Sequence, residues 1–133
     1  MKSRIRNPFP KRLLGINLTN EHKDALSEIA ESEGIELVLH GGDMAGEQIG
    51  FLCGFGGFQP AAKREDKITE ECLVFAGIDG NDLNRLLKTL REKEVKIDLK
   101  AMVTATNQSW SLAELVTELK KEHGYMNGGR KNG

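Results

Sequence analysis

Cysteine and long apolar runs are both scarce in this chain of 133 residues. The only two cysteines, Cys53 and Cys72, fit none of the short spacings of metal or redox motifs, so neither a disulfide framework nor a metal site is expected. No apolar run approaches the length of a membrane span, and residues 1–10 lack the apolar middle of a signal peptide. These absences predict a cytoplasmic protein that carries no cofactor and has no membrane partner.

An excess of charge of either sign is also absent. The 19 basic and 20 acidic side chains give a net charge of −1, so the overall charge does not attract nucleic acid. The local exception is residues 1–12, a basic arm without an acidic residue, in which Pro8 and Pro10 oppose regular structure. We expect this arm to be flexible, and nucleic acid is not an expected partner.

The rest of the chain shows the order strand, helix, strand twice. Strand patterns occupy 13–18, 35–40, 72–77 and 96–103, and helical patterns occupy 20–33 and 81–94. A shift of 60 positions superposes the apolar residues of the two stretches, as in Leu13 with Leu73 and Leu39 with Leu99. This internal repeat predicts one α/β domain over residues 13–123. Its pseudo-duplicated βαβ units fall in the halves 13–60 and 72–123, joined by a charged linker, 61–71.

Two four-stranded sheets fit this order. Strands that are apolar on both sides belong in the centre, and alternating strands belong at the edges. A parallel sheet ordered 2-1-3-4 needs a crossover helix within residues 41–58, whereas a ferredoxin-like α+β two-layer sandwich, ordered 4-1-3-2, needs a long hairpin there. The repeat sets Gln48 and Leu52 on Gln108 and Leu112, which favours the parallel sheet.

The last helix has the clearest start in the chain. Ser111 and Glu114 form a capping box, and Trp110 with Leu115 has the spacing of a hydrophobic staple. Gly124 is expected to end this C-terminal helix, which leaves residues 124–133 as a flexible tail.

The sequence VTATNQSW followed by SLAELVTELKKEH resembles a family known as domain-of-unknown-function 3783, a group of uncharacterised bacterial proteins. The resemblance covers residues 72–123, and its most distinctive part is 104–110. It implies a small cytoplasmic bacterial protein of unassigned role, and it supplies no activity, cofactor or catalytic residue.

The polar turn before the last helix is the first candidate for a ligand site. Its hydroxyls, amides and free backbone N–H groups suit an anion or a carboxylate. A second polar loop follows the third strand. The candidate ligand-binding residues of the two loops are Thr104, Thr106, Asn107, Gln108, Asp79 and Gly80. The alternative is structural, since such residues also fix turns, and Asp79 has the position of a helix cap.

A cluster of aromatic residues is the candidate partner patch. Phe51, Phe55 and Phe58 lie within eight residues of one another, and on an exposed loop they would contact a protein partner. The alternative is that they cover one end of the core.

Three classes of function remain from the sequence. The first is a non-enzymatic ligand- or partner-binding module with a regulatory role, because no general base stands beside a nucleophile. The second is a small enzyme that uses Cys53 or Asp79, and the third is a nucleic-acid accessory protein that uses the basic arm. A homodimer also remains an alternative, since an edge strand or the phenylalanine cluster would supply its interface.

Overall fold

A computed structural model of the chain describes residues 9–61 and 67–132, with side chains as far as His123. Most of the predicted basic arm, 1–12, therefore lies outside the described residues. The first βαβ unit comprises β1 (Arg12–Ile16), α1 (Asn20–Glu33) and β2 (Glu36–His40). The second comprises β3 (Cys72–Ala76), α3 (Gly80–Glu92) and β4 (Leu99–Met102). The remaining elements are the short helices η1 (Gly42–Met44), α2 (Ile49–Leu52) and η2 (Asn107–Ser109), and the long helix α4 (Leu112–Asn132).

The four strands form one sheet in the order β2-β1-β3-β4. Each unit is parallel within itself, β1 with β2 and β3 with β4, but the central pair β1 and β3 is antiparallel. The predicted α/β class, the strand order and the central position of the two apolar strands are confirmed. The fully parallel sheet and the ferredoxin-like alternative are both wrong, because the observed sheet is mixed.

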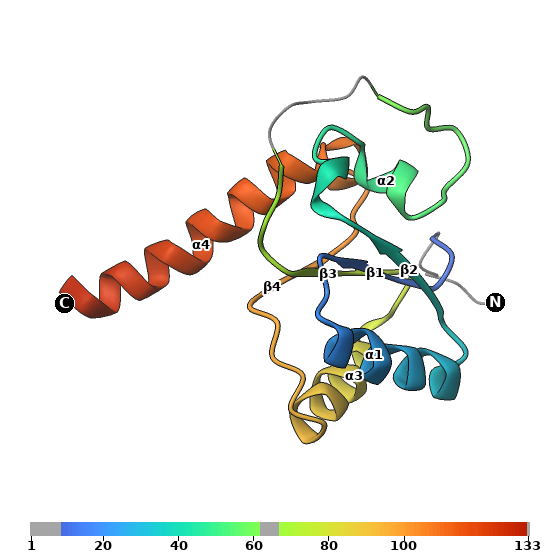
Figure 1. Ribbon diagram of the computed structural model, residues 1–133, viewed down its shortest axis with the longest axis horizontal. Helices are drawn as coiled ribbons and strands as arrows, with labels where there is room; N and C mark the ends of the chain where they lie inside the picture. Colours follow the sequence, from blue (N-terminus) through green and yellow to red (C-terminus); the bar gives the residue numbers. More distant parts are fainter. Residues whose placement is uncertain (1–8, 62–66, 133) are drawn as a thin grey trace.

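The chain between β2 and β3 explains the direction of β3. It contains the single turn α2, and it then returns to the end of the sheet that it left: the Ile68 N–H donates to the Gly42 oxygen at 3.0 Å. For β3 to run parallel to β1, the chain would first have to travel along the length of the strands to the opposite end of the sheet. Since it returns instead, β3 starts where β2 ends and runs the opposite way (Figure 1).

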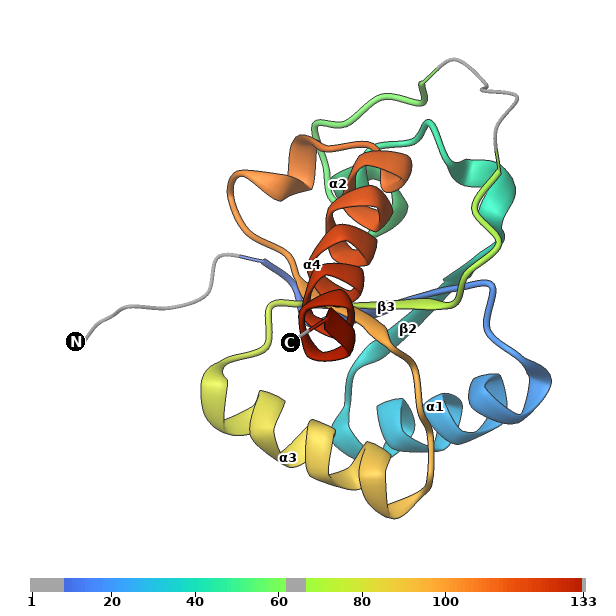
Figure 2. The same cartoon turned by 90° about the vertical axis from the view of Figure 1, so that its left-hand side faces the viewer.

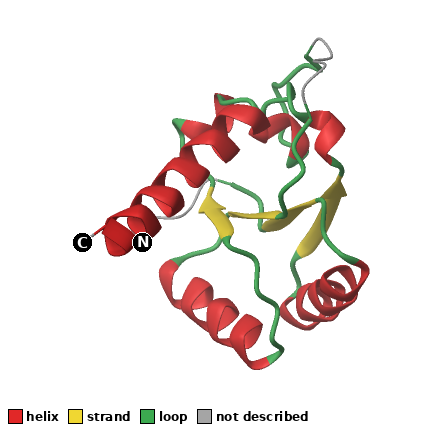
Figure 3. Cartoon of the chain, turned by 60° about the vertical axis from the view of Figure 1, so that its left-hand side comes forward, coloured by secondary structure: helices red, strands yellow, loops and turns green. Residues whose placement is uncertain are grey.

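Helices cover both faces of the sheet. α1 and α3 pack on one face, and α2 and α4 lie over the other (Figures 1 and 3). Alternate residues of the central strands enter the two cores, with Leu13 and Leu73 toward α1 and α3 and with Leu14 and Val74 on the other face. The sheet is therefore the middle of three layers, which is why its central strands are apolar on both sides.

The two units match closely at the centre of the sheet and less closely beyond it. β1 and β3 are equal in length and pair with each other along their whole length. The two parallel pairs differ in register. Arg12 of β1 lies opposite Glu36, 24 positions later, whereas Cys72 of β3 lies opposite Leu99, 27 positions later. Gln48 forms an isolated antiparallel bridge with Ser111, and its alignment with Gln108 stays a prediction.

Helix α4 begins as predicted and ends later. The Glu114 N–H donates to Ser111 Oγ at 3.1 Å, and the Ser111 N–H donates to Glu114 Oε1 at 2.9 Å, which confirms the capping box. The helix continues past Gly124 to Asn132 and projects beyond the sheet (Figures 1 and 2). A glycine inside a helix costs only about 1 kcal/mol relative to alanine, so it does not by itself end one. No helix of the described residues is both long enough and apolar enough to cross a membrane.

Candidate binding site

The polar turn after β4 is held by its own hydrogen bonds. The Thr104 N–H donates to Asn107 Oδ1 at 2.8 Å, and the Asn107 N–H donates to Thr104 Oγ1 at 3.0 Å. Asn107 Nδ2 donates to the Met102 oxygen at 3.0 Å, and Gln108 Nε2 donates to the Ala105 oxygen at 3.3 Å. The side-chain amides of Asn107 and Gln108, which were candidates for binding a ligand, thus form hydrogen bonds within the turn. Thr106 is exposed beside them. These bonds favour a structural role, and ligand binding at the turn stays a prediction.

The loop after β3 lies apart from that turn. Asp79 caps α3 by accepting a hydrogen bond from the Asp82 N–H at 3.0 Å, and Gly80 is the first residue of the helix. Both loops leave the same end of the sheet, because β3 and β4 are parallel. The chain then turns toward α3 on one face and toward α4 on the other (Figure 1). Asp79 and the polar turn therefore do not face each other across a common site.

Both cysteine thiols are poor candidates for a nucleophile. Cys53 and Cys72 are fully buried. Burial raises the pKa of the Cys53 thiol to about 12, although the Arg12 charge opposes the shift, and burial raises the pKa of Cys72 to about 12 as well. Thiols with such pKa values stay protonated near neutral pH. Within the described ranges, no group of three or more histidine, cysteine, aspartate or glutamate side chains is placed to hold a metal ion.

The predicted partner patch is largely packed inside the fold. Phe51 on α2 and Phe55 just after it lie half-buried against the core on this face of the sheet, and the ring of Phe55 stacks on Phe9 with centroids 5.2 Å apart. The ring of Phe58 covers Gly50, where an added Cβ would lie 2.4 Å from it. The three rings thus cover one end of the core, and their contact with a partner stays a prediction.

The opposite end of the mixed sheet gathers a different set of polar residues. Asn17, with φ of 56°, follows β1 and reaches the linker there. Its Nδ2 donates to the Ile68 oxygen at 2.7 Å and the Glu70 oxygen at 3.1 Å, and its Oδ1 accepts from the Gly42 N–H at 2.8 Å. A Cβ on Gly42 would lie 1.7 Å from the Ile68 oxygen, so only glycine fits beneath the linker. Asn17, Gly42 and Ile68 together form a clamp that holds the linker against the ends of β1 and β2.

Two acidic residues of the linker extend this clamp to the helices. Glu71 Oε2 accepts from the Thr19 N–H at 2.9 Å and lies 2.7 Å from His22 Nδ1. Glu70 Oε2 lies 2.6 Å from Lys120 Nζ on α4, and this hydrogen bond holds the pKa of the Glu70 carboxyl below its usual value. The end of the linker, residues 70–71, is therefore fixed to the start of α1 on one side and to α4 on the other.

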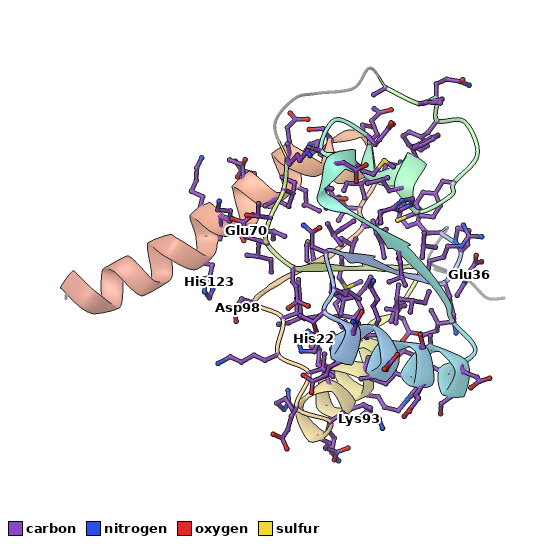
Figure 4. All side chains as sticks on the ribbon, viewed as in Figure 1. His22, Glu36, Glu70, Lys93, Asp98 and His123 are labelled. Atoms are coloured by element: carbon purple, nitrogen blue, oxygen red, sulfur yellow. The ribbon has the colours of Figure 1, made fainter. Side chains whose placement is uncertain are left out.

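A cavity of about 400 Å³ opens beside these contacts. It lies between the linker, α4 and the residues that lead into β4, and it is lined by Glu70, Glu71, Lys96, Asp98, Leu99, Lys120 and His123. Figure 4 shows Glu70, His123 and Asp98 along the side of the molecule that α4 crosses. Lys96, Asp98 and His123 are exposed, and the described residues offer them no hydrogen bond or ion pair. The cavity thus presents unpaired groups of both charges.

Most of this cavity and the whole of the polar turn fall in one stretch of the chain. Residues 71–126 match the DUF3783 family. The family model is described as a domain of unknown function, so it confirms the predicted resemblance and adds no activity. Neither the curated proteins nor the solved structures contain a match to the chain.

The DUF3783 stretch supplies every residue that lines the cavity except Glu70. Sequence reasoning missed these residues, because Glu70 and Glu71 belong to a charged linker and Lys96 and Asp98 resemble the solvated face of an edge strand. One signal was present: acidic residues stand directly before both strands of the second unit, Glu71 before β3 and Asp98 before β4. In the mixed sheet these strand starts meet at one end.

Proposed function

We propose that this protein is a non-enzymatic binding module that takes a small zwitterionic ligand in the cavity between the linker, α4 and β4. The observation that carries the proposal is a set of three ionisable groups, Lys96, Asp98 and His123, that have no partner among the described residues and surround a space of about 400 Å³. Lys96 suits a ligand carboxylate, and Asp98 suits a ligand ammonium group. Pockets of a few hundred Å³ are of the size that holds small molecules.

Several contacts support a binding role over catalysis. Both thiols are buried and protonated near neutral pH, and Asp79 is engaged as a helix cap. His22 and Glu71 form a histidine–carboxylate pair near the cavity, but Glu71 also accepts from the Thr19 N–H and so fastens the linker. Among the described residues, no serine or cysteine hydrogen-bonds to that pair.

The same proposal includes a bacterial, cytoplasmic origin and an internal duplication. The first is what the resemblance of the sequence to DUF3783 implies. Matched positions in the two units support the second: Thr19 and Asp79, which are aligned by the repeat, cap corresponding helices.

A thermal-shift screen of amino acids, dipeptides and other small zwitterions tests the ligand proposal. A ligand at about 100 times its Kd stabilises the native state by about 2.7 kcal/mol, which raises the Tm of a domain of this size by roughly 10 °C. Asp98→Asn and Lys96→Met should each remove the shift.

The matched controls are Asp24→Asn and Lys88→Met, which change exposed charges on α1 and α3 and leave the cavity intact. If no zwitterion raises the Tm, or if Asp98→Asn keeps the whole shift, the cavity is not a ligand site.

A further inference from the structure

The outer edge of β2 is the most open strand edge of the described fold. β2 lies at the margin of the sheet, and no described strand pairs with its outer side (Figure 1). Proteins usually protect such an edge with lysine, proline, a bulge or a covering segment. β2 reads Glu-Leu-Val-Leu-His and contains neither lysine nor proline, and its one acidic side chain, Glu36, lies 3.2 Å from Arg12 Nε of the neighbouring β1.

The other margin of the sheet differs from β2. β4 carries Lys100 at its exposed second position, and Asn107 Nδ2 donates to the Met102 oxygen at its end. β4 also contacts α4, which starts a few residues later. Of the two outer strands, β2 is therefore the one with an edge open to pairing with another strand.

Leu37 and Leu39 turn their backbone groups outward along this edge. The Asn17 N–H donates to the His40 oxygen at 3.1 Å, so His40 directs its backbone toward β1. Backbone direction alternates along a strand, so Val38 and Glu36 also face β1 while Leu37 and Leu39 face away. The side chain of Leu39 is 41% exposed, and it is the large apolar side chain that stands out as exposed among the described residues.

The sequence of β2 is complementary to itself in an antiparallel arrangement. With a twofold axis at Val38, Leu37 lies opposite the partner's Leu39, and their outward N–H and C=O groups form reciprocal hydrogen bonds. Glu36 then lies opposite the partner's His40, and Val38 opposite its own copy. A shift of the axis to Glu36 would place two glutamates together, which is unfavourable.

One flank of α1 lies on the same side of the molecule as the β2 edge. Lys23 of α1 lines a depression together with Leu39 and His40, so this flank of the helix faces the β2 side. Ser27 lies one turn further along the same flank, and Gly34 at the end of the helix has open space where a Cβ would stand. Ser27 and Gly34 are the small residues on this flank, and the charged side chains Lys23 and Glu31 stand on either side of Ser27.

We propose that two copies of this chain associate through β2, with the antiparallel pairs centred on Val38, to form a continuous eight-stranded sheet. The dimer does not depend on the ligand proposed above, because the β2 edge lies away from the cavity: Figure 4 shows Glu36 on the far side of the molecule from Asp98 and His123.

Sedimentation velocity of the full chain, from low micromolar to millimolar concentration, tests the association. The wild type should shift from monomer to dimer over this range. Leu39→Lys places a charge on the exposed edge position and should raise the dimer Kd at least tenfold, while Ser32→Lys, an exposed site on α1, should leave it unchanged. Circular dichroism confirms that each variant is folded. A chain that stays monomeric, or a dimer that Leu39→Lys leaves intact, overturns the proposal.

Disulfide trapping tests the register. Opposed residues of a non-hydrogen-bonded pair have Cα atoms about 4.5 Å apart, so Val38→Cys should cross-link to its own copy under mild oxidation. Glu36→Cys is the matched control, because its copies would stand four residues apart along the strand, about 13 Å. The native thiols are buried and give little background. Cross-linking of Glu36→Cys but not of Val38→Cys would overturn the register at Val38.

Discussion

The loops that follow β1 and β3 occupy corresponding places in the two units and differ in what they hold. Asn17 and Gly77 both adopt the left-handed conformation, with φ of 56° and 69°, and a capping residue follows each by two positions. Asn17 uses its amide to fasten the linker, whereas Gly77 is covered by the backbone of Phe9 and Pro10. The same backbone turn therefore serves as a fastening point in one unit and as a site of close chain approach in the other.

The largest effect is expected at Asn17. Asn17→Ala removes three hydrogen bonds, leaves the Gly42 N–H without that acceptor and places alanine in a left-handed conformation. Together these changes should cost about 2–4 kcal/mol in the free energy of unfolding, measured by urea denaturation. Asn17→Gly separates the causes, because glycine removes the amide and relieves the backbone strain. If Asn17→Gly is more stable than the wild type, strain relief outweighs the lost hydrogen bonds and the clamp is not a main source of stability.

A smaller loss of stability, similar in size at the two sites, is expected at the helix caps Thr19 and Asp79. Thr19 accepts from the His22 N–H at 3.1 Å and Asp79 from the Asp82 N–H at 3.0 Å, so Thr19→Ala and Asp79→Ala should each cost about 1 kcal/mol. Thermal denaturation measures both, with Thr19→Ser and Asp79→Asn as variants that retain a cap. Asp79→Ala should also leave any ligand-induced rise in Tm intact. If Asp79→Ala abolished the ligand-induced rise in Tm, Asp79 would be part of the ligand site.

The smallest effect is expected where α1 and α3 meet through an ion pair. Arg85 Nη2 lies 2.7 Å from Glu33 Oε1, and the hydrogen bond from Arg85 holds the pKa of the Glu33 carboxyl below 4.5. A lowered folded-state pKa means that the pair adds stability above the unfolded-state pKa and loses it as the pH falls through the folded-state value.

Glu33→Gln should therefore cost less than either cap at neutral pH, and the difference from the wild type should vanish in acid and shrink in high salt. Denaturant curves at several pH values measure it. A difference that grows on acidification would contradict this assignment.

The elements that depend on local pattern could be predicted from the sequence. The stripe of leucines in α3, the caps at Thr19 and Asp79, and the capping box of Ser111 and Glu114 depend on residues a few positions apart. The direction of β3 could not be predicted, because it depends on contacts of Asn17 and Gly42 with Ile68, which lies 51 positions beyond Asn17 in the chain.

The candidate cavity was missed for the same reason. A parallel β3 would have placed Asp79 and the polar turn beside the ends of β1 and β2. The antiparallel β3 places Glu71 and Asp98 there instead. Helix ends and turns can be predicted from neighbouring residues. Which side chains meet at one end of a sheet depends on the directions of its strands, and these are set by contacts between distant residues.

The antiparallel pairing of β1 with β3 also has a consequence for how the chain folds. Each βαβ unit forms from residues close in sequence, but this central ladder joins residues up to 64 positions apart and is the one that unites the two units within the described sheet. Closing so long a loop is slow relative to forming local contacts. Until it closes, each unit exposes an apolar strand that belongs in the middle of the sheet, so the newly made chain is most prone to aggregate between the folding of its units and their union.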